Sequence, residues 1–299
     1  YSPSLATGTV AAAGTLAALI PPSIPFVLYG IFSETSVTKL LIAGVLPGLL
    51  TAGIYGAMLV GRCIINPKIA PPVDIRTNWP ERWRALFEIW PVAFLILGVI
   101  GSLMSGIVTP TEAGAYGAFL AYVIAFVQRR LTWEVFKLTV LEAVTSTSRL
   151  LFVAVGAILL TKFLALSGLP FYLADLMEGW ALDPVLLMAG TSIVYLVLGM
   201  FLDPLGILLI TIPIFVPMFE RLGLDLVWFG VIVVKYLEIG LLTPPVGFNV
   251  YVIKTVVGPD ISLETIFRGV GWFLACEAVI MVLLLSFPQI SLYLPSLMD

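Results

Sequence analysis

The sequences IPPSIPF at residues 20–26 and TPPVGFN at residues 243–249 each place a pair of prolines inside a long apolar stretch. Proline has no N–H group to bond to the preceding helical turn, and its ring clashes with the carbonyl four residues earlier. In a bilayer, the freed backbone groups are tolerated only where protein buries them or where they line a wet cavity. Two matched breaks of this kind are typical of a transporter with its binding site near the membrane midplane.

The composition of the chain is that of a membrane protein. Of its 299 residues, 60% are hydrophobic and 11% are charged, and the mean hydropathy is +1.10. Its recurrent apolar runs of about 17–25 residues match the thickness of a bilayer core. The sequence therefore predicts an all-α, polytopic membrane protein.

Charge and residue types exclude several classes of function. The formal net charge of −3 indicates no nucleic-acid partner, and Cys63 and Cys276 are too few and too far apart for a disulfide framework or a metal site. The absence of histidine removes the commonest general base and metal ligand. The acidic residues expected at membrane depth, Asp203, Glu238 and Glu277, are dispersed along the chain. An intramembrane enzyme is therefore a remote alternative.

The apolar segments predict a definite order of elements. In the first half we expect a broken helix over 4–30, a span over 39–61, a long polar loop over 62–88, paired segments over 89–105 and 113–127, a surface helix over 133–145 and a span over 149–166. After an acidic link we expect paired segments over 184–200 and 205–219, a second broken helix over 226–252 and a last span over 271–288.

The basic residues predict the orientation in the membrane. Segments 62–88 and 128–137 hold most of the lysines and arginines, which favour the cytoplasmic side. The acidic link at 167–183 is then periplasmic. For the segment 254–270 to be cytoplasmic as well, residues 184–219 must form a re-entrant hairpin. Two full spans there would place 254–270 outside, and the hairpin is the preferred interpretation.

The two proline breaks also indicate an internal repeat. Shifting residues 1–30 by 223 positions superposes Pro21-Pro22 on Pro244-Pro245. Because the two broken helices run in opposite directions in this topology, they predict inverted repeats. Residues 1–88 would be the remainder of the first repeat, with a broken helix, one span and a cytoplasmic loop. Residues 89–299 would be the second, with scaffold spans, a surface helix, the hairpin 184–219, the broken helix and the final span.

The broken helices offer chemistry for ions and anions. An interrupted helix exposes carbonyls at one half-helix and N–H groups at the other, which suit Na⁺ and a carboxylate respectively. We expect Na⁺ to bind through Thr15, Ser23 and Thr243 together with nearby backbone carbonyls. Asn249 also lies beside the second break. The alternative is a pair of packing kinks without a ligand.

Two charged positions have both structural and functional interpretations. Asp203 precedes Pro204 between two glycines, so it either faces a cavity at membrane depth or caps the following helix, and both roles can hold at once. Lys235 and Glu238 lie three residues apart on one predicted helix and can form an ion pair. A structural pair that shields two buried charges is the preferred interpretation there.

Four motifs in this order resemble the large membrane subunit of the tripartite ATP-independent periplasmic (TRAP) transporters. They are Gly14-Thr15 with IPPSIP at 20–25, GIVTPTEA at 106–113, GMFLDP at 199–204 and LEIGLLTPPVGFN at 237–249, spread over nearly all 299 residues. The resemblance implies a Na⁺-coupled elevator-type importer in a bacterial inner membrane, with no enzymatic activity and no cofactor besides the coupling ion. It implies two partners: a small four-helix membrane subunit and a periplasmic binding protein that delivers an organic anion such as a dicarboxylate, a sugar acid or sialic acid.

The resemblance also indicates where substrate and ion bind. The predicted residues lie at the first break, at the hairpin tip and around the second break: Gly14, Thr15, Pro21, Pro22, Ser23, Pro25, Gly199, Asp203, Pro204, Glu238, Thr243, Pro244, Pro245, Gly247 and Asn249.

The chain departs from the family pattern in its length. Family members begin with further spans, so we expect this sequence to be the C-terminal two-thirds or so of the subunit and not to transport alone. The alternative within membrane transport is a Na⁺/dicarboxylate symporter that needs no binding protein. Its hairpin tips typically carry Ser-Asn-Thr, which is absent from this sequence.

Overall fold

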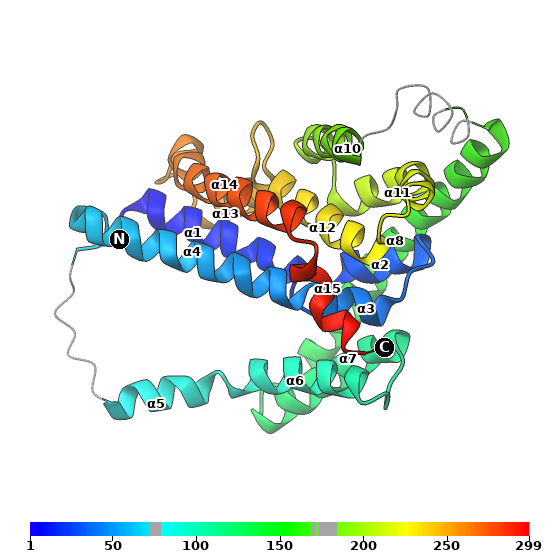
Figure 1. Cartoon of the computed structure of the whole chain (residues 1–299). Helices are drawn as coiled ribbons and strands as arrows, with labels where there is room; N and C mark the ends of the chain where they lie inside the picture. Colours follow the sequence, from blue (N-terminus) through cyan, green and yellow to red (C-terminus); the bar gives the residue numbers. More distant parts are fainter. Residues whose placement is uncertain (72–78, 169–171, 173–183, 299) are drawn as a thin grey trace. The chain divides into compact units, whose positions relative to one another are not determined.

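The computed structural model describes residues 1–71, 79–168, 172 and 184–298, and its regular elements there are all helices (Figure 1). Contacts divide the chain into two compact units. Unit 1 comprises Tyr1–Pro72 and Leu160–Asp299, and unit 2 comprises Val73–Leu159. The predicted periplasmic link at 167–183 lies almost entirely outside the described residues.

Unit 1 begins with the first broken helix. Helix α1 (Pro3–Thr15) passes into the short 3-10 helix η1 (Leu16–Ala18), and after the proline pair the chain resumes as α2 (Ile24–Phe32). The break predicted within 4–30 is therefore confirmed. Helices α3 (Val37–Ala43) and α4 (Val45–Ile65) follow and together cover the predicted span, and a second 3-10 helix, η2 (Pro67–Ile69), comes after them.

The remainder of unit 1 contains the predicted hairpin segments and the second broken helix. Helices α10 (Pro184–Gly199) and α11 (Pro204–Arg221) occupy the two hairpin segments. Helices α12 (Leu226–Leu242) and α13 (Phe248–Val257) lie on either side of the second proline pair, so this break is confirmed as well. Helices α14 (Leu263–Ser286) and α15 (Gln289–Ser296) complete the unit.

Helix α12 is the core of unit 1. Nearly all of its residues are buried, and it contacts α2, α3, α10, α11, α13, α14 and α15. The ring of Phe229 stacks on that of Phe219 in α11, with centroids 3.7 Å apart. The indole N–H of Trp228 donates to the carbonyl of Leu284 in α14 over 3.0 Å. A helix that is apolar on nearly all sides is expected to be enclosed by others. Because α12 ends at Leu242, the second break begins at the end of the central helix of the unit.

Unit 2 corrects two of the sequence-based expectations. Its helices are α5 (Trp79–Glu88), α6 (Trp90–Met104), α7 (Pro110–Val127) and the first part of α8 (Trp133–Ser167). The prediction of a polar loop over 62–88 was wrong for residues 79–88, which form α5. Apolar residues at helical spacing make this helix amphipathic. The division into a surface helix and a span was also wrong, since α8 runs without interruption and no proline or glycine occurs before Gly156 to break it.

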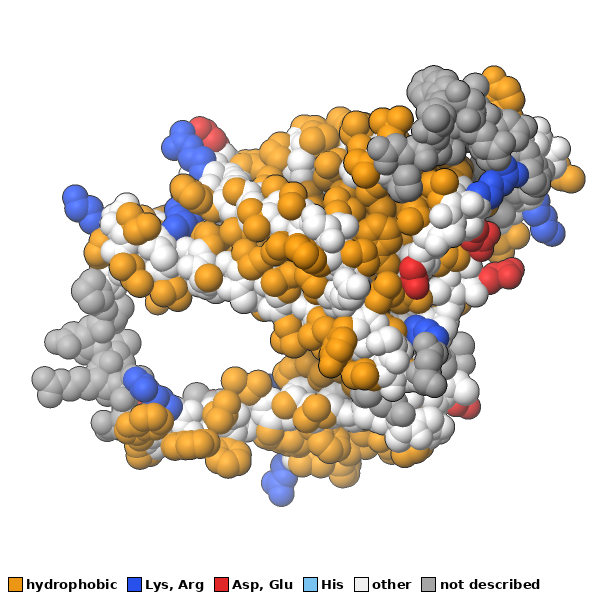
Figure 2. Space-filling view, in the orientation of Figure 1, with side chains coloured by type: hydrophobic (Ala, Val, Ile, Leu, Met, Phe, Trp, Pro, Cys, Tyr) orange, Lys and Arg blue, Asp and Glu red, His pale blue; other side chains and the backbone are white. Residues whose placement is uncertain are grey.

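The helices have the length and surface of membrane-spanning segments. Within the described parts of the chain, four helices are long and apolar enough to cross a membrane. The number is five if α5 and α6, which are bent by 44° relative to each other, count as one span. Apolar side chains cover much of the face of each unit seen in Figure 2. On α14, for example, Val279 and Val282 are exposed while Phe273 and Ile280 are buried. Exposed apolar surface of this extent requires lipid or a protein partner.

Candidate functional site

Hydroxyl groups hold the two ends of the first break. Thr15 and Ser23 are both buried, and Thr15 Oγ1 donates to the carbonyl of Ala12 over 2.8 Å. Ser23 caps α2, because its Oγ accepts from the N–H of Phe26 over 3.3 Å while donating to the carbonyl of Ala18. The proline pair between them, Pro21-Pro22, has a cis peptide bond. Serine is a preferred N-cap residue, so local sequence accounts for the start of α2.

The second break has a related construction. Thr243 follows the last residue of α12, and its Oγ1 donates to the carbonyl of Ile239 over 2.6 Å. The Pro244–Pro245 peptide bond is also cis. Gly247 begins α13 with a left-handed backbone (φ +56°), and a Cβ there would lie 3.0 Å from the ring of Phe267. No side chain caps the N-terminus of α13. The N–H of Val250 donates to the carbonyl of Gly247 over 2.8 Å, so the N–H groups of Phe248 and Asn249 are left for another acceptor.

The structure brings the two breaks together within unit 1. The side-chain amide of Asn249, just past the second break, donates to the carbonyl of Ala11 in α1 over 3.3 Å. A Cβ on Gly14 would lie 3.7 Å from the same amide nitrogen. Helix α1 contacts both α12 and α13, and η1 also contacts α12. Residues predicted separately at the two ends of the chain thus form one region.

The hairpin tip lies against the last part of α12. A Cβ on Gly199 would be 2.9 Å from the Cα of Gly240, so the two helices touch through backbone there. Asp203 is exposed and caps α11, because its Oδ2 accepts from the N–H groups of Leu205 (3.1 Å) and Gly206 (3.2 Å). The capping role of Asp203 is confirmed. These two hydrogen bonds are to its own helix and connect Asp203 to neither break.

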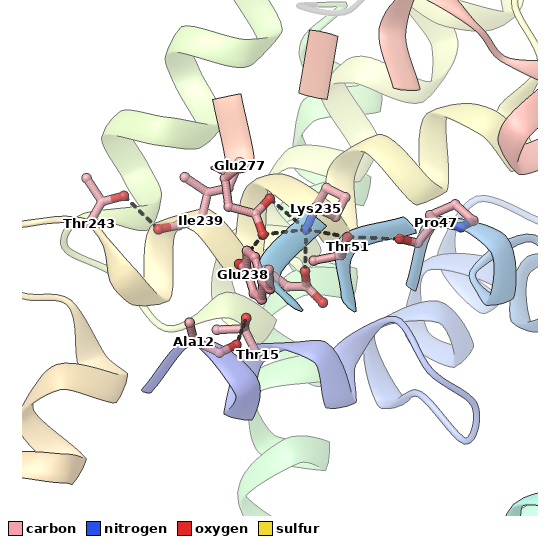
Figure 3. A network of polar contacts seen from close by, with 10 residues as sticks. Ala12, Thr15, Pro47, Thr51, Lys235, Glu238, Ile239, Thr243 and Glu277 are labelled. Carbon is pink, nitrogen blue, oxygen red and sulfur yellow. Dashed lines mark hydrogen bonds and ion pairs between the residues drawn. The ribbon is translucent and has the colours of Figure 1, made fainter. Parts of the chain in front are cut away.

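The predicted ion pair of Lys235 and Glu238 is confirmed, with 2.9 Å between Nζ and Oε2. Sequence reasoning missed its partners. Glu277 of α14 approaches the same ammonium to 2.6 Å, and Thr51 of α4 also joins the cluster (Figure 3). The hydroxyl of Tyr55, also on α4, donates to Glu277. The sequence feature that could have indicated this partner was Glu277 itself, an acidic residue in the middle of the last apolar span.

Three surface hollows in the described parts of the chain contain no predicted site residue. One, of about 600 Å³, lies between α1 and α4, and another, of about 720 Å³, lies beside α10, α12 and α14. The third is within unit 2. Apolar side chains dominate all three linings. The predicted site residues around the breaks therefore lie outside these three hollows.

Among the described residues, helices long and apolar enough to cross a membrane, together with two broken helices in one unit, are typical of a multi-pass membrane permease. Comparison with known proteins identifies its family. Residues 1–290 match the family described as the tripartite ATP-independent periplasmic transporter, DctM component. The chain belongs to this family of TRAP transporter large permeases, as the sequence motifs indicated. It is accordingly a multi-pass protein of the bacterial inner membrane, and a transport component rather than an enzyme.

Three relatives show the extent of the similarity. The C4-dicarboxylate TRAP transporter large permease protein DctM of Pseudomonas aeruginosa is 36% identical over 299 residues, covering 99% of this chain and 68% of the relative. The sialic acid TRAP transporter large permease protein SiaM of Vibrio cholerae is 33% identical, covering 99% and 69%. The 2,3-diketo-L-gulonate TRAP transporter large permease protein YiaN of Escherichia coli is 30% identical, covering 97% and 67%.

Proposed function

We propose that this chain carries the ion and substrate sites of a Na⁺-coupled TRAP importer for a small organic anion. A periplasmic binding protein delivers the anion, and a small four-helix membrane subunit accompanies the permease. The observation that carries the proposal is the meeting of the two broken helices, where Asn249 bonds to the backbone of Ala11. Membership of a tripartite family supports the two partners.

The substrate class follows from the chemistry of the second break. Relatives are named for C4-dicarboxylates, sialic acid and 2,3-diketo-L-gulonate, each of which carries a carboxylate. In this chain the N-terminus of α13 has no side-chain cap, whereas Ser23 caps α2 and Asp203 caps α11. A helix N-terminus with unpaired N–H groups favours an anion. We assign the substrate carboxylate to the start of α13.

The coupling ion is assigned to the hydroxyl groups that flank the breaks. The hydroxyls of Thr15, Ser23 and Thr243 each donate to a carbonyl. Ser23 Oγ also accepts from the N–H of Phe26, so each of the three oxygens keeps at least one lone pair for a cation. The last carbonyls of α1 and α12 add partial negative charge. Together they offer oxygen ligands for Na⁺ without a full charge.

The elevator mechanism is the motion that best suits this arrangement. In it, the hairpin α10–α11 and the broken helix α12–α13 carry the site across the membrane together. Their packing around the buried helix α12 supports movement as one body. The inverted repeats over 1–88 and 89–299 remain predictions, as does the re-entrant hairpin, because α11 is by itself long enough to cross a membrane.

Replacing Thr243 by valine tests the ion assignment. Thr243→Val removes one oxygen and nearly keeps the side-chain shape. In the full-length protein, reconstituted with its two partners in liposomes, uptake should need more Na⁺. Loss of a ligand worth about 1.4 kcal/mol raises the half-saturating concentration about tenfold.

Thr255 provides the matched control. Its hydroxyl also donates to a carbonyl in its own helix, that of Val252 at 2.7 Å, but it is exposed on α13. Thr255→Val should leave the Na⁺ dependence unchanged. The same Na⁺ dependence in Thr243→Val and wild type would show that Thr243 only packs. Uptake that persists without any binding protein would favour the symporter alternative.

A further inference from the structure

A cluster of charged side chains is buried between α4, α12 and α14 (Figure 3). Lys235 Nζ lies 2.9 Å from Glu238 Oε2 and 2.6 Å from Glu277 Oε2. The ammonium also donates to Thr51 Oγ1 over 3.4 Å, and the hydroxyl of Tyr55 donates to Glu277 Oε1. The side chains of Lys235, Glu238 and Glu277 are 0%, 0% and 1% exposed.

The donors in this cluster do not satisfy its acceptors. The lysine ammonium has three N–H groups, and its hydrogen bonds go to Glu238 Oε2, Glu277 Oε1 and Thr51. Glu238 Oε1 is buried without a hydrogen-bond partner among the described groups, whereas Glu277 Oε2 is buried in ion-pair contact with the ammonium at 2.6 Å. Glu238 Oε1 would accept one more positively polarised hydrogen.

The charges do not balance either. One ammonium faces two carboxylates, so the cluster carries a net charge of −1 when both are ionised. The other groups close to it are uncharged: the hydroxyl of Tyr55 from α4, the thiol of Cys276 from α14 and the backbone N–H of Leu19 near Glu238. Among the described ion pairs, only Lys235 faces these carboxylates. A buried charge without a counter-charge is costly and is relieved by proton uptake.

We propose that Lys235, Glu238 and Glu277 form a proton-binding site that holds one proton on its two carboxylates at neutral pH. The proton brings the cluster to zero net charge and turns one carboxyl oxygen into a donor. Because the carboxylates share one ammonium, the proton belongs to the pair rather than to either residue.

The position of the cluster gives the proton a role in transport. Glu238 lies near the backbone of Leu19, at the edge of the first break, and its own helix ends at the second break. Release of the proton would therefore place one negative charge beside both breaks. This role rests on the proposed transport function, whereas the proton site itself does not.

Infrared difference spectroscopy of the purified full-length protein in lipid nanodiscs tests the site without any transport assay. A protonated carboxyl absorbs apart from ionised carboxylates. We expect its band at neutral pH, and we expect carbon-13 labelling of glutamate carboxyls to shift the band in the unmutated protein. Glu238→Gln and Glu277→Gln should each abolish it, because the ammonium then faces a single carboxylate.

Glu264→Gln is the matched control. Glu264 is on the same helix as Glu277 but is 73% exposed and paired with Arg268 at 2.7 Å, so the band should persist. Absence of a glutamate band in the wild-type protein would overturn the proposal, and this measurement needs no variant to fold. A band that survives both glutamine substitutions in folded protein would overturn it too. Loss of the band with unchanged uptake would support the proton site and contradict only its role in transport.

Discussion

At the residue scale, the hydroxyl side chains beside the breaks bond to backbone carbonyls of the preceding helical segment. Thr15 bonds to Ala12, and Thr243 bonds to Ile239. Hydrogen bonds of this kind satisfy carbonyls that a helix end would otherwise leave unpaired. Each hydroxyl therefore serves the fold through its proton, and the lone pairs of its oxygen can still accept.

Asp203 provides the clearest test of a single side chain. Asp203→Ala removes the cap of α11 and should lower the free energy of unfolding by about 1 kcal/mol. Asp203→Asn keeps an oxygen in the cap and should be close to the wild type in thermal unfolding. Both cap bonds use Oδ2, so Oδ1 is available for a ligand. If the charge contributes to coupling, both variants lose uptake. Normal transport by Asp203→Asn would restrict the residue to capping.

At the element scale, glycines set the distance between two pairs of helices. Gly8 of α1 meets Gly269 of α14, and Gly199 of α10 meets Gly240 of α12. In each pair a Cβ would lie within 3 Å of backbone atoms of the other helix. Backbone cannot move aside as a flexible side chain does, so these contacts position the first broken helix and the hairpin tip.

Gly269→Ala should separate α1 from α14. The added Cβ would lie 2.0 Å from the carbonyl oxygen of Ser4, and overpacking of this kind costs about 1–3 kcal/mol. Gly271→Ala on the same helix has open space and should be neutral or stabilising by up to about 1 kcal/mol. Thermal unfolding of the two variants makes the comparison. Equal stability of the two would contradict the close approach of α1 and α14.

Gly240→Ala should displace the hairpin tip, because its Cβ would lie 2.7 Å from the Cα of Gly199. We expect a loss of stability of about 1–3 kcal/mol together with slower uptake. Gly190→Ala is the control on α10, since nothing lies within 4 Å of a Cβ there. A Gly240→Ala protein with normal stability and uptake would show that the contact between α10 and α12 does not position the site.

At the scale of the whole molecule, cysteine labelling tests the predicted topology. In a background with Cys63→Ser and Cys276→Ala, we expect a cysteine at Arg76 to react from the cytoplasmic side and one at Glu178 from the periplasmic side. Segments 62–88 and 128–137 hold most of the basic residues, and basic loops stay inside. Both positions are outside the described residues, so only the experiment places them. Labelling of the two from one side would contradict the orientation and with it the re-entrant hairpin.

The sequence by itself determined the features that depend on local chemistry. Paired prolines cannot continue a helix, so both breaks were predictable, and an aspartate before a proline predicted the start of α11. Even local prediction failed where two signals competed. The amphipathic pattern of α5 lies in a segment dominated by charge and proline, and α8 joins a polar stretch to an apolar one without a breaker.

Only the tertiary structure decided which distant residues meet. Asn249 reaches Ala11 across 238 positions, and Tyr55 reaches Glu277 across 222. Lys235 and Glu238 were predictable as a pair because three residues separate them on one helix. Their partner on α14 was not predictable, because the packing of α4, α12 and α14 sets which faces adjoin, and no local pattern in the chain records that packing.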